Sequence, residues 1–280
     1  MMANNIKEME TVIVERRGKI GIITLNRPDK RNSLTDTLLN EMYAAVTELD
    51  QDEEIRVLIV KGAGKAFCAG YDLSPREEPF TTVLQWRTHA KHGNRLMFSI
   101  WNCRKPVIAQ IQGYALGGGC DLAMVCDFTI AAESCMLGEP EIQFNSAPPF
   151  GNIMPNLIGM KKTKALLLTG DRISASEAER IGLVTACVPD DKLEEEVMAL
   201  AKKLVKVPVP AMRLNKEAIN RNYEISGMLD AIHFNEEIFA DVLMSETPEA
   251  AKFFEIQNKE GLAAAFKWRD AFFAEENPEN

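Results

Sequence analysis

The sequence predicts an α/β protein in which helices cover the faces of a partly parallel sheet. In residues 12–132, short β-branched apolar runs alternate with stretches whose apolar residues recur at helical spacing. After about residue 161 the strand pattern fades and only helical patterns continue. Strands separated by helices favour parallel pairing. A length of 280 residues suits one large domain, or a domain with an appendage.

The first half of the chain contains five expected strands and three expected helices. A turn at Arg17-Gly18 separates the first two strands, and Pro28 and Asn32 interrupt the pattern after them. The strands are expected at residues 12–15, 20–25, 55–61, 106–111 and 127–132. The helices are expected at residues 36–49, 80–101 and 117–125.

The second half is predicted to be helical. Ser174 and Glu177 have the spacing of a capping box, which predicts a helix that begins there and ends near Gly182. Further helices are expected at residues 190–205, 208–223, 228–244 and 248–258. The last segment, residues 260–274, has an apolar face that contains Leu262, Phe266 and Phe273. A helical tail of this kind often packs on a neighbouring subunit.

Charge and cysteine usage exclude several classes of function. The net charge of −9 disfavours a nucleic-acid partner, because binding to a phosphate backbone needs a basic surface. Six cysteines occur without a CxxC pair, and with only three histidines no zinc-ligand spacing is present. No stretch approaches the ~18 apolar residues of a membrane span, and the final ENPEN matches no peroxisomal or lipidation signal. We therefore expect reduced thiols, no metal, no membrane partner and a cytoplasmic location.

Two glycine-rich segments follow expected strands. The first, residues 61–70, fails as a P-loop, because Ile59 stands where glycine is needed and Ala66 where Ser or Thr is needed. A plain glycine turn explains most of it. The second, the triplet at residues 117–119, leads from a strand into a helix, where unpaired N–H groups can hold a ligand oxygen as in an oxyanion hole. Tight helix–strand packing is the alternative explanation of the triplet.

Three carboxylates follow the glycine triplet. Asp121 falls in the first turn of the expected helix, where a negative charge also stabilises the helix dipole. Glu139 and Glu141 flank a proline twenty residues later, in what could be an ordinary exposed loop. Two acids that converge on one site raise each other's pKa and can act as acid and base.

Five motifs taken together resemble the crotonase (enoyl-CoA hydratase/isomerase) family in order and spacing, over about residues 10–270. They are NRPDKRNSL, AFCAGYDL, KPVIAQIQGYALGGGCDLAMVCDFTIA, GEPE and LTGDRISASEAERIGLV. The resemblance implies a crotonase-type spiral of ββα units, with residues 1–195 as the core that holds an acyl-CoA site. Residues 196–280 would form a helical oligomerisation region used in trimerisation, giving a homotrimer or hexamer. Coenzyme A is part of the substrate in this family, so no separate cofactor is expected.

The resemblance also implies roles for individual residues. The backbone N–H groups of Tyr71 and Gly118 would hold the enolate oxygen of the thioester, which leaves the Tyr71 side chain free to vary. Asp121 and Glu141 would hold the water that adds to the double bond. CoA would contact Lys30, Arg31, Ala69, Asp72 and Leu73. The acyl pocket would contain Trp86, Phe98, Trp101, Pro149 and Phe150, which suggests a bulky or cyclic acyl group.

Departures from the family pattern leave alternatives open. Hydratases of the family have glutamate where this sequence has Asp121, a side chain one methylene shorter. An isomerase that uses Glu141 alone is therefore an alternative, whereas the related dienoyl isomerases and dehalogenases need an aspartate where Pro149 stands. The Pro-Pro-x-Gly-Asn element at residues 148–152 is similar to that of aromatic hydratase-lyases. A non-catalytic binding member of the family is the alternative from another class. We expect a hydratase.

Overall fold

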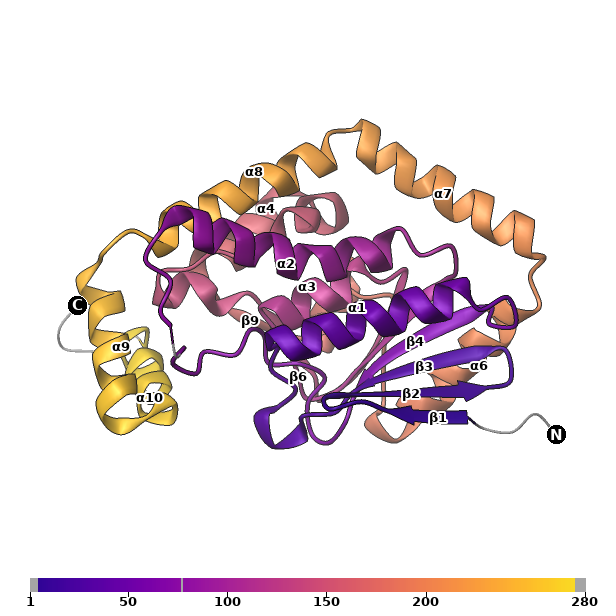
Figure 1. The fold of residues 1–280 in the computed structure, drawn as a ribbon, viewed down its shortest axis with the longest axis horizontal. Helices are drawn as coiled ribbons and strands as arrows, with labels where there is room; N and C mark the ends of the chain where they lie inside the picture. The colour runs from indigo at the N-terminus through magenta and orange to yellow at the C-terminus, as the bar shows by residue number, and fades with distance from the viewer. Residues whose placement is uncertain (1–4, 77, 275–280) are drawn as a thin grey trace.

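A computed structural model describes residues 5–76 and 78–274, which form two β-sheets surrounded by helices (Figure 1). The larger sheet has the order β1-β2-β3-β4-β5-β7-β10. Its first three strands pair antiparallel, and all pairs from β3 to β10 are parallel. Its strands are β1 (Asn5–Glu8), β2 (Val12–Arg17), β3 (Ile20–Leu25), β4 (Val57–Gly62), β5 (Val107–Ile111), β7 (Phe128–Ala132) and β10 (Ala186–Val188).

The smaller sheet consists of three-residue strands that the sequence analysis did not predict. They are β6 (Tyr114–Leu116), β8 (Met136–Gly138) and β9 (Arg172–Ser174). Parallel bridges between Cys68 and Ala115 and between Leu34 and Tyr71 continue its pattern. Because β5 and β7 belong to the large sheet and β6 and β8 to the small one, each turn of the chain adds one strand to each sheet. This spiral confirms the expected fold class.

Helices cover both faces of the larger sheet. On one face lie α1 (Asp36–Gln51), α2 (Val83–Trp101) and α3 (Gly118–Val125), and on the other lies α6 (Leu193–Val205) (Figure 1). Side chains alternate along each strand, so Ile23 packs in the core with α1 while Ile22 packs with α6. Every residue of α3 is buried. The expected helices at residues 36–49 and 117–125 are confirmed within two residues.

Helix α2 begins three residues later than predicted. The Thr82 hydroxyl accepts a hydrogen bond from the Gln85 N–H, and the Gln85 side chain accepts one from the Thr82 N–H. This reciprocal capping fixes the first turn at Val83. The helix α4 (Met154–Thr169) was not predicted, because Gly159 at φ 73° interrupts its helical backbone. At α5 (Ala175–Ile181), Ser174 caps the helix as expected.

The carboxyl-terminal helices are α7 (Val209–Ile225), α8 (Met228–Leu243), α9 (Pro248–Glu260) and α10 (Leu262–Phe272). Figure 1 shows α7 and α8 as a long arch over the core. No residue of α7 is buried, and polar contacts hold it: Lys216 Nζ lies 2.7 Å from Asp127 Oδ2, and Trp101 Nε1 donates to Glu224. Polar contacts thus hold α7, whereas α8 packs on the core through the buried side chains of Met228 and Ile232.

Helices α9 and α10 pack on their own chain. Phe253 stacks on Phe144 with ring centres 5.6 Å apart, and the Gln257 amide donates to the Leu73 carbonyl at 2.5 Å. The predicted division at residues 195/196 falls within α6 and stays a prediction. The ends of both predicted regions, including all of ENPEN, lie outside the described residues.

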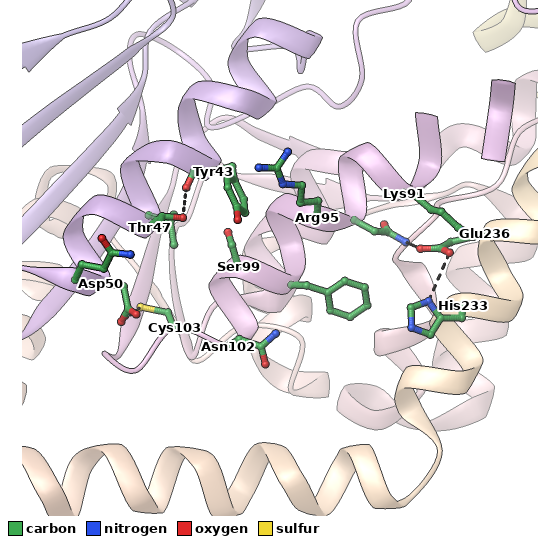
Figure 2. A pocket seen from close by; sticks show the side chains of 14 residues that line it. Tyr43, Thr47, Asp50, Lys91, Arg95, Ser99, Asn102, Cys103, His233 and Glu236 are labelled. Atoms are coloured by element: carbon green, nitrogen blue, oxygen red, sulfur yellow. Dashed lines mark hydrogen bonds and ion pairs between the residues drawn. The ribbon is translucent and has the colours of Figure 1, made fainter. Parts of the chain in front are cut away.

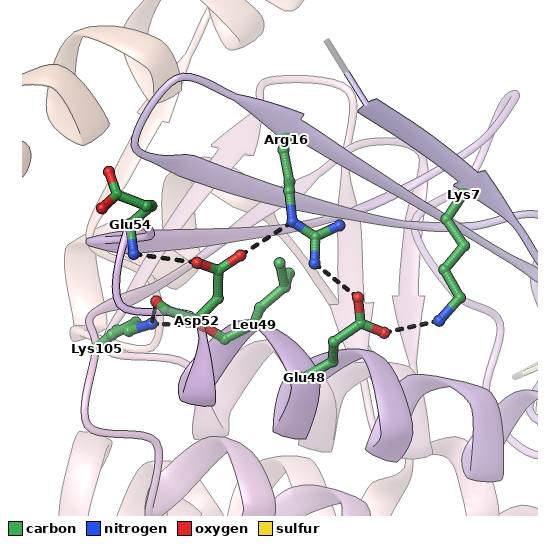
Figure 3. A network of polar contacts seen from close by, with 7 residues as sticks. All are labelled: Lys7, Arg16, Glu48, Leu49, Asp52, Glu54 and Lys105. Carbon is green, nitrogen blue, oxygen red and sulfur yellow. Dashed lines mark hydrogen bonds and ion pairs between the residues drawn. The ribbon is translucent and has the colours of Figure 1, made fainter. Parts of the chain in front are cut away.

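A network of ion pairs fastens the edge of the large sheet to α1 (Figure 3). Glu48 pairs with Lys7 on β1 at 2.7 Å and with Arg16 on β2 at 2.6 Å, and Arg16 also pairs with Asp52 at 3.1 Å. Hydrogen bonds from Lys7 and Arg16 lower the pKa of Glu48. Exposed pairs of this kind are worth well under ~1 kcal/mol each, so the network aligns the edge strands more than it stabilises the fold.

Candidate active site

The smaller sheet brings the glycine triplet and the Glu-Pro-Glu segment together. Strands β6 and β8 are parallel, with Leu116 opposite Gly138, so the residues that follow both strands emerge at the same edge. The Gly117 N–H donates to the Gly138 carbonyl at 2.9 Å and locks this junction. Asp121 then projects from the first turn of α3, and Glu141 from the short helix η2 (Pro140–Phe144).

Gly117 makes direct room for the Glu141 carboxylate. A Cβ atom on Gly117 would lie 2.0 Å from Glu141 Oε1. The residue also has φ 53° and ψ −130°, a conformation that favours glycine. The first glycine of the triplet is therefore explained both by the turn into α3 and by the position of the acid.

Three buried carboxyl groups form the centre of the site. Asp121 is fully buried and Glu139 is 1% exposed, while Glu141 retains 8% exposure. Neither oxygen of Asp121 or of Glu139, nor Oε2 of Glu141, makes a hydrogen bond of ordinary geometry with the described residues. Buried polar atoms are normally paired, so a cluster of three such carboxyl groups is a candidate functional site.

Burial raises the pKa of all three acids, and the charge of a neighbouring acid raises it further for Asp121 and Glu139. Burial raises the pKa of Glu141 to about 7. The pKa of Asp121 is raised well above its ordinary value by burial and by the charge of Glu141, and that of Glu139 by burial and by the charge of Asp121. The cluster therefore keeps protons at neutral pH, which suits acid–base chemistry. The sequence analysis noted Glu139 but assigned it no role, because the three-residue strand β8 before it leaves no recognisable pattern in the sequence.

The N–H groups expected to form the oxyanion hole belong to Tyr71 and Gly118. Leu34 exchanges hydrogen bonds with the residues on either side of Tyr71, through Gly70 O and Asp72 N, so the Tyr71 N–H points away from that strand. On that other side lies Gly118: a Cβ on Gly70 would be 3.6 Å from Gly118 N. Within the described residues no hydrogen bond takes up the N–H of Tyr71 or of Gly118. Both N–H groups are therefore without a partner in this part of the chain.

The segments predicted to contact CoA are tied together by Arg27 and Asn32. The Asn32 amide donates to three backbone carbonyls of residues 63–67, and the Ala69 N–H donates to the Arg31 carbonyl at 3.0 Å. Asp72 pairs with Arg27 at 3.0 Å. Burial alone would raise the pKa of Asp72, but hydrogen bonds from Ser74, Arg27 and Ser33 lower it to about 2.

Lys30 lies exposed in the short helix η1 (Pro28–Lys30), and the Leu73 carbonyl is taken up by Gln257 on α9. The sequence analysis did not assign Arg27 or Asn32 a function. The NRPDKRN motif that contains both was the available signal.

The residues predicted to line an acyl pocket fall into separate groups. Phe98 and Phe150 are in contact, with ring centres 5.4 Å apart, and the Pro149 carbonyl lies 3.5 Å from the Asn94 amide nitrogen. Trp86 packs against His89 and Phe239. Trp101 is engaged elsewhere, because its indole N–H donates to Glu224 on α7. The structure thus brings Pro149 and Phe150 to α2, and Trp101 to the arch.

A large cavity lies apart from the acids (Figure 2). It has a volume of about 720 Å³ between α1, α2 and α8, and its lining includes Tyr43, Arg95, Phe98 and His233. Neither Asp121 nor Glu141 contributes to the lining. Its lining contains the acids Asp50 and Glu236, and Glu236 pairs with His233 at 3.5 Å. Because it contains neither the glycine triplet nor the three buried acids beside it, this cavity is not the candidate catalytic centre.

Metal ligands and membrane spans are both missing from residues 5–76 and 78–274. No group of three His, Cys, Asp or Glu side chains in this part of the chain could hold a metal ion. Nor does it contain a helix with the length and apolar character needed to cross a membrane.

Comparisons with known proteins agree with this geometry. Residues 15–262 match the family model described as enoyl-CoA hydratase/isomerase. A probable enoyl-CoA hydratase of Rhizobium meliloti (strain 1021) is 36% identical over 266 residues, which cover 94% of this chain and 98% of that protein. The short-chain-enoyl-CoA hydratase of Clostridium acetobutylicum is 36% identical over 260 residues, covering 91% and 98%. A solved enoyl-CoA hydratase/isomerase from Xanthobacter autotrophicus Py2 superposes with a TM-score of 0.90 at 34% identity, covering 95% of this chain and all of the other.

Proposed function

The chain belongs to the enoyl-CoA hydratase/isomerase family and is a hydratase-like enzyme, and on that basis we propose that it adds water across the α,β double bond of an enoyl-CoA thioester with Asp121 and Glu141 as its acids. The observation that carries the proposal is the meeting of these two acids beside the glycine triplet. Gly117 seats the Glu141 carboxylate, and Asp121 lies one helical turn beyond Gly118.

The thioester carbonyl would bind between the N–H groups of Tyr71 and Gly118. As water attacks the β-carbon, the electron pair of the double bond moves onto the carbonyl oxygen, and two preorganised donors stabilise that charge. Loss of one such donor typically costs about 10²–10³ in rate. The addition involves no net oxidation or reduction, and CoA arrives with the substrate, so the proposal includes no separate cofactor and no metal.

Asp121 and Glu141 would share one proton in the resting site. Because the two groups interact strongly, that proton belongs to the pair rather than to either residue. In the proposed step Asp121 holds the water and accepts its proton as the C–O bond forms, and Glu141 gives a proton to the α-carbon. The pair ends with the same number of protons, so one H₂O has been added. The shorter side chain of Asp121 requires the water to lie nearer α3 than a glutamate would place it.

A second candidate function is isomerisation of the double bond by Glu141 alone. The observation in its favour is the pKa of about 7 for Glu141, which lets a single group remove a proton and return it at neutral pH. The aromatic hydratase-lyase alternative has the Pro148–Pro149 loop in its favour, but it requires a cleavage step in addition to hydration. Hydration makes use of both buried acids and is therefore the first choice.

The proposal extends to the acyl group, the assembly and the compartment. The aromatic residues near α2 support a bulky or cyclic acyl group. A homotrimer or hexamer is supported by α7, on which Leu214 and Ile219 are about 60% exposed. A cytoplasmic location is supported by the six cysteines, all of which are free thiols.

Substitution of each acid tests the proposed reaction. Hydration of 2-butenoyl-CoA is followed as the loss of the conjugated thioester absorbance in wild type, Asp121→Asn, Glu141→Gln and the double variant. Each single substitution should cost about 10²–10⁴ in kcat, and the double variant little more, because both acids serve one water and one proton. Glu133→Gln, an exposed glutamate, is the matched control. A severe effect of Glu141→Gln with a mild effect of Asp121→Asn would favour the isomerase, and mild effects of both would refute the assignment of the site.

A further inference from the structure

Gly93 creates a recess in the middle of α2 that holds the hydroxyl of Tyr71. A Cβ atom on this buried glycine would lie 2.1 Å from Tyr71 Oη and 3.1 Å from Tyr71 Cζ. Glycine is a poor residue for a helix interior, and nothing in the helix geometry requires one here. The missing side chain is explained by the phenol that takes its place.

The opposite side of the Tyr71 ring contacts the start of α3. A Cβ atom on Gly118 would lie 2.7 Å from Tyr71 Cε2 and 2.9 Å from Leu34 Cδ1. The ring therefore stands between Gly93 and Gly118, directly beside one of the two N–H donors. Since Tyr71 itself supplies the other donor, its side chain begins at the point where the thioester oxygen would bind.

Aromatic side chains of α2 extend the wall that the Tyr71 ring begins. His89 packs against Tyr71 at 5.7 Å with an interplanar angle of 63°, and Trp86 packs against His89 at 6.1 Å. Trp86, His89 and Gly93 recur at helical spacing and share one face of α2. Burial, with the nearby charges of Asp121 and Glu141, raises the pKa of Tyr71, so the phenol stays neutral and the wall is uncharged.

We propose that the side chain of Tyr71, seated in the recess of Gly93, determines acyl-chain specificity by closing the site to long acyl groups. The inference rests on the proposed function. The N–H of Tyr71 fixes the carbonyl oxygen and the acids fix the α- and β-carbons, so carbons beyond the β-carbon must pass the Tyr71 ring. The substrates are compact acyl groups, either short chains or a ring attached close to the double bond.

The first test is Tyr71→Leu, which shortens the side chain and keeps the backbone N–H. kcat/KM is measured for 2-butenoyl-, 2-hexenoyl-, 2-octenoyl- and 2-decenoyl-CoA. One methylene of fit in an apolar pocket is worth about 10–200-fold in discrimination, so the decenoyl-to-butenoyl ratio should rise at least about tenfold. The matched control is Tyr43→Leu, a half-buried tyrosine on α1 that lines the separate cavity. Its ratio should equal that of wild type.

The second test uses the recess itself. Gly93→Ala puts a methyl group on Oη and pushes the ring toward Gly118, so kcat/KM should fall about tenfold or more on every chain length. Tyr71→Phe in the Gly93→Ala background should restore activity, because the nearest ring atom would then be 3.1 Å away. Circular dichroism of each variant separates a loss of fold from displacement of the ring, and only rescue by Phe identifies the hydroxyl as the cause.

Failure of the inference and failure of the proposed function give different results. If wild type hydrates 2-butenoyl-CoA but Tyr71→Leu leaves the chain-length ratio unchanged, the specificity role is refuted and the hydratase proposal stands. If Gly93→Ala is as active as wild type, the recess does not hold the phenol in the working enzyme, which also refutes the inference. If wild type hydrates neither this series nor an enoyl-CoA with a ring attached close to the double bond, the proposed function itself fails.

Discussion

Gly117→Ala should separate the position of Glu141 from its chemistry. The new Cβ would lie 2.0 Å from Glu141 Oε1 and 2.9 Å from the carboxyl carbon, whereas ordinary contact begins at 3.4 Å. The carboxylate must therefore move by about 1.4 Å, although both catalytic acids remain in the sequence. Displacements near 1 Å typically cost about 10² in rate. We expect kcat/KM for 2-butenoyl-CoA to fall at least about 10²-fold.

The same substitution also has a cost in stability. Gly117 has φ 53° and ψ −130°, a backbone conformation that is largely confined to glycine, and an alanine there costs about 1–3 kcal/mol of unfolding free energy. Gly18→Ala is the matched control, because Gly18 has φ 62° and a Cβ atom there would meet no other atom within 4 Å. Urea unfolding should show a similar loss for both variants, and only Gly117→Ala should lose activity.

One result would refute this reasoning about Gly117. If Gly117→Ala is folded and keeps more than about a tenth of the wild-type kcat/KM, Glu141 does not need the position that it has beside the triplet. An equal loss of activity in Gly18→Ala would show that backbone strain, rather than displacement of the acid, governs turnover.

Three further predictions follow from buried polar groups. Burial raises the pKa of Glu141 from 4.5 to about 7, so the unfolding free energy should fall by up to ~3 kcal/mol as pH rises from 4.5 to 7. Glu141→Gln should remove this fall and give a higher Tm than wild type at alkaline pH. Equal Tm profiles of the two proteins would contradict the prediction. Glu139→Gln should keep kcat/KM within about threefold of the wild-type value, because the amide replaces a carboxyl group that burial keeps neutral. A loss of kcat/KM as large as that of Glu141→Gln would show that Glu139 acts in its charged form. Asn32→Ala should lower the unfolding free energy by about 2–5 kcal/mol, because the Asn32 amide donates to three backbone carbonyls and its oxygen accepts a hydrogen bond from the Arg27 N–H. The control is Asn215→Ala, which removes one exposed hydrogen bond. Equal losses of unfolding free energy in the two variants would refute the prediction.

Five of the seven strands of the larger sheet and the two acids could be predicted from the sequence, but β1, β10 and the sheet that joins the acids could not. Apolar runs of five or six residues, such as β4 and β5, have a recognisable pattern. Strands β6, β8 and β9 have three residues each, too few for any periodicity to appear. Their pairing nevertheless sets Asp121 beside Glu141. The expectation that Asp121 and Glu141 share one site came instead from the resemblance to a family.

The sequence also could not show which individual polar or aromatic residues are buried. Glu139 has the composition of a loop acid beside a proline, yet it is buried because β8 ends at the residue before it. The Tyr71 side chain was interpreted as free to vary, and the structure shows it packed between Gly93 and Gly118. Contacts between residues so distant in the chain leave no local pattern, so only the folded chain shows them.

Hydrogen bonds join α8 to the loop that follows Glu141, and they determine when the site can form during synthesis. The Asn235 amide donates to the Pro148 carbonyl at 2.5 Å, and Asn145 donates to the Val242 carbonyl at 3.1 Å. Gln257 adds a bond to Leu73 across 184 positions of sequence. During synthesis Asp121 and Glu141, the proposed catalytic acids, leave the ribosome about a hundred residues before these anchors do. A nascent chain therefore contains both acids before the helices that hold the loop have been made. The site can form only after α8 and α9 have emerged.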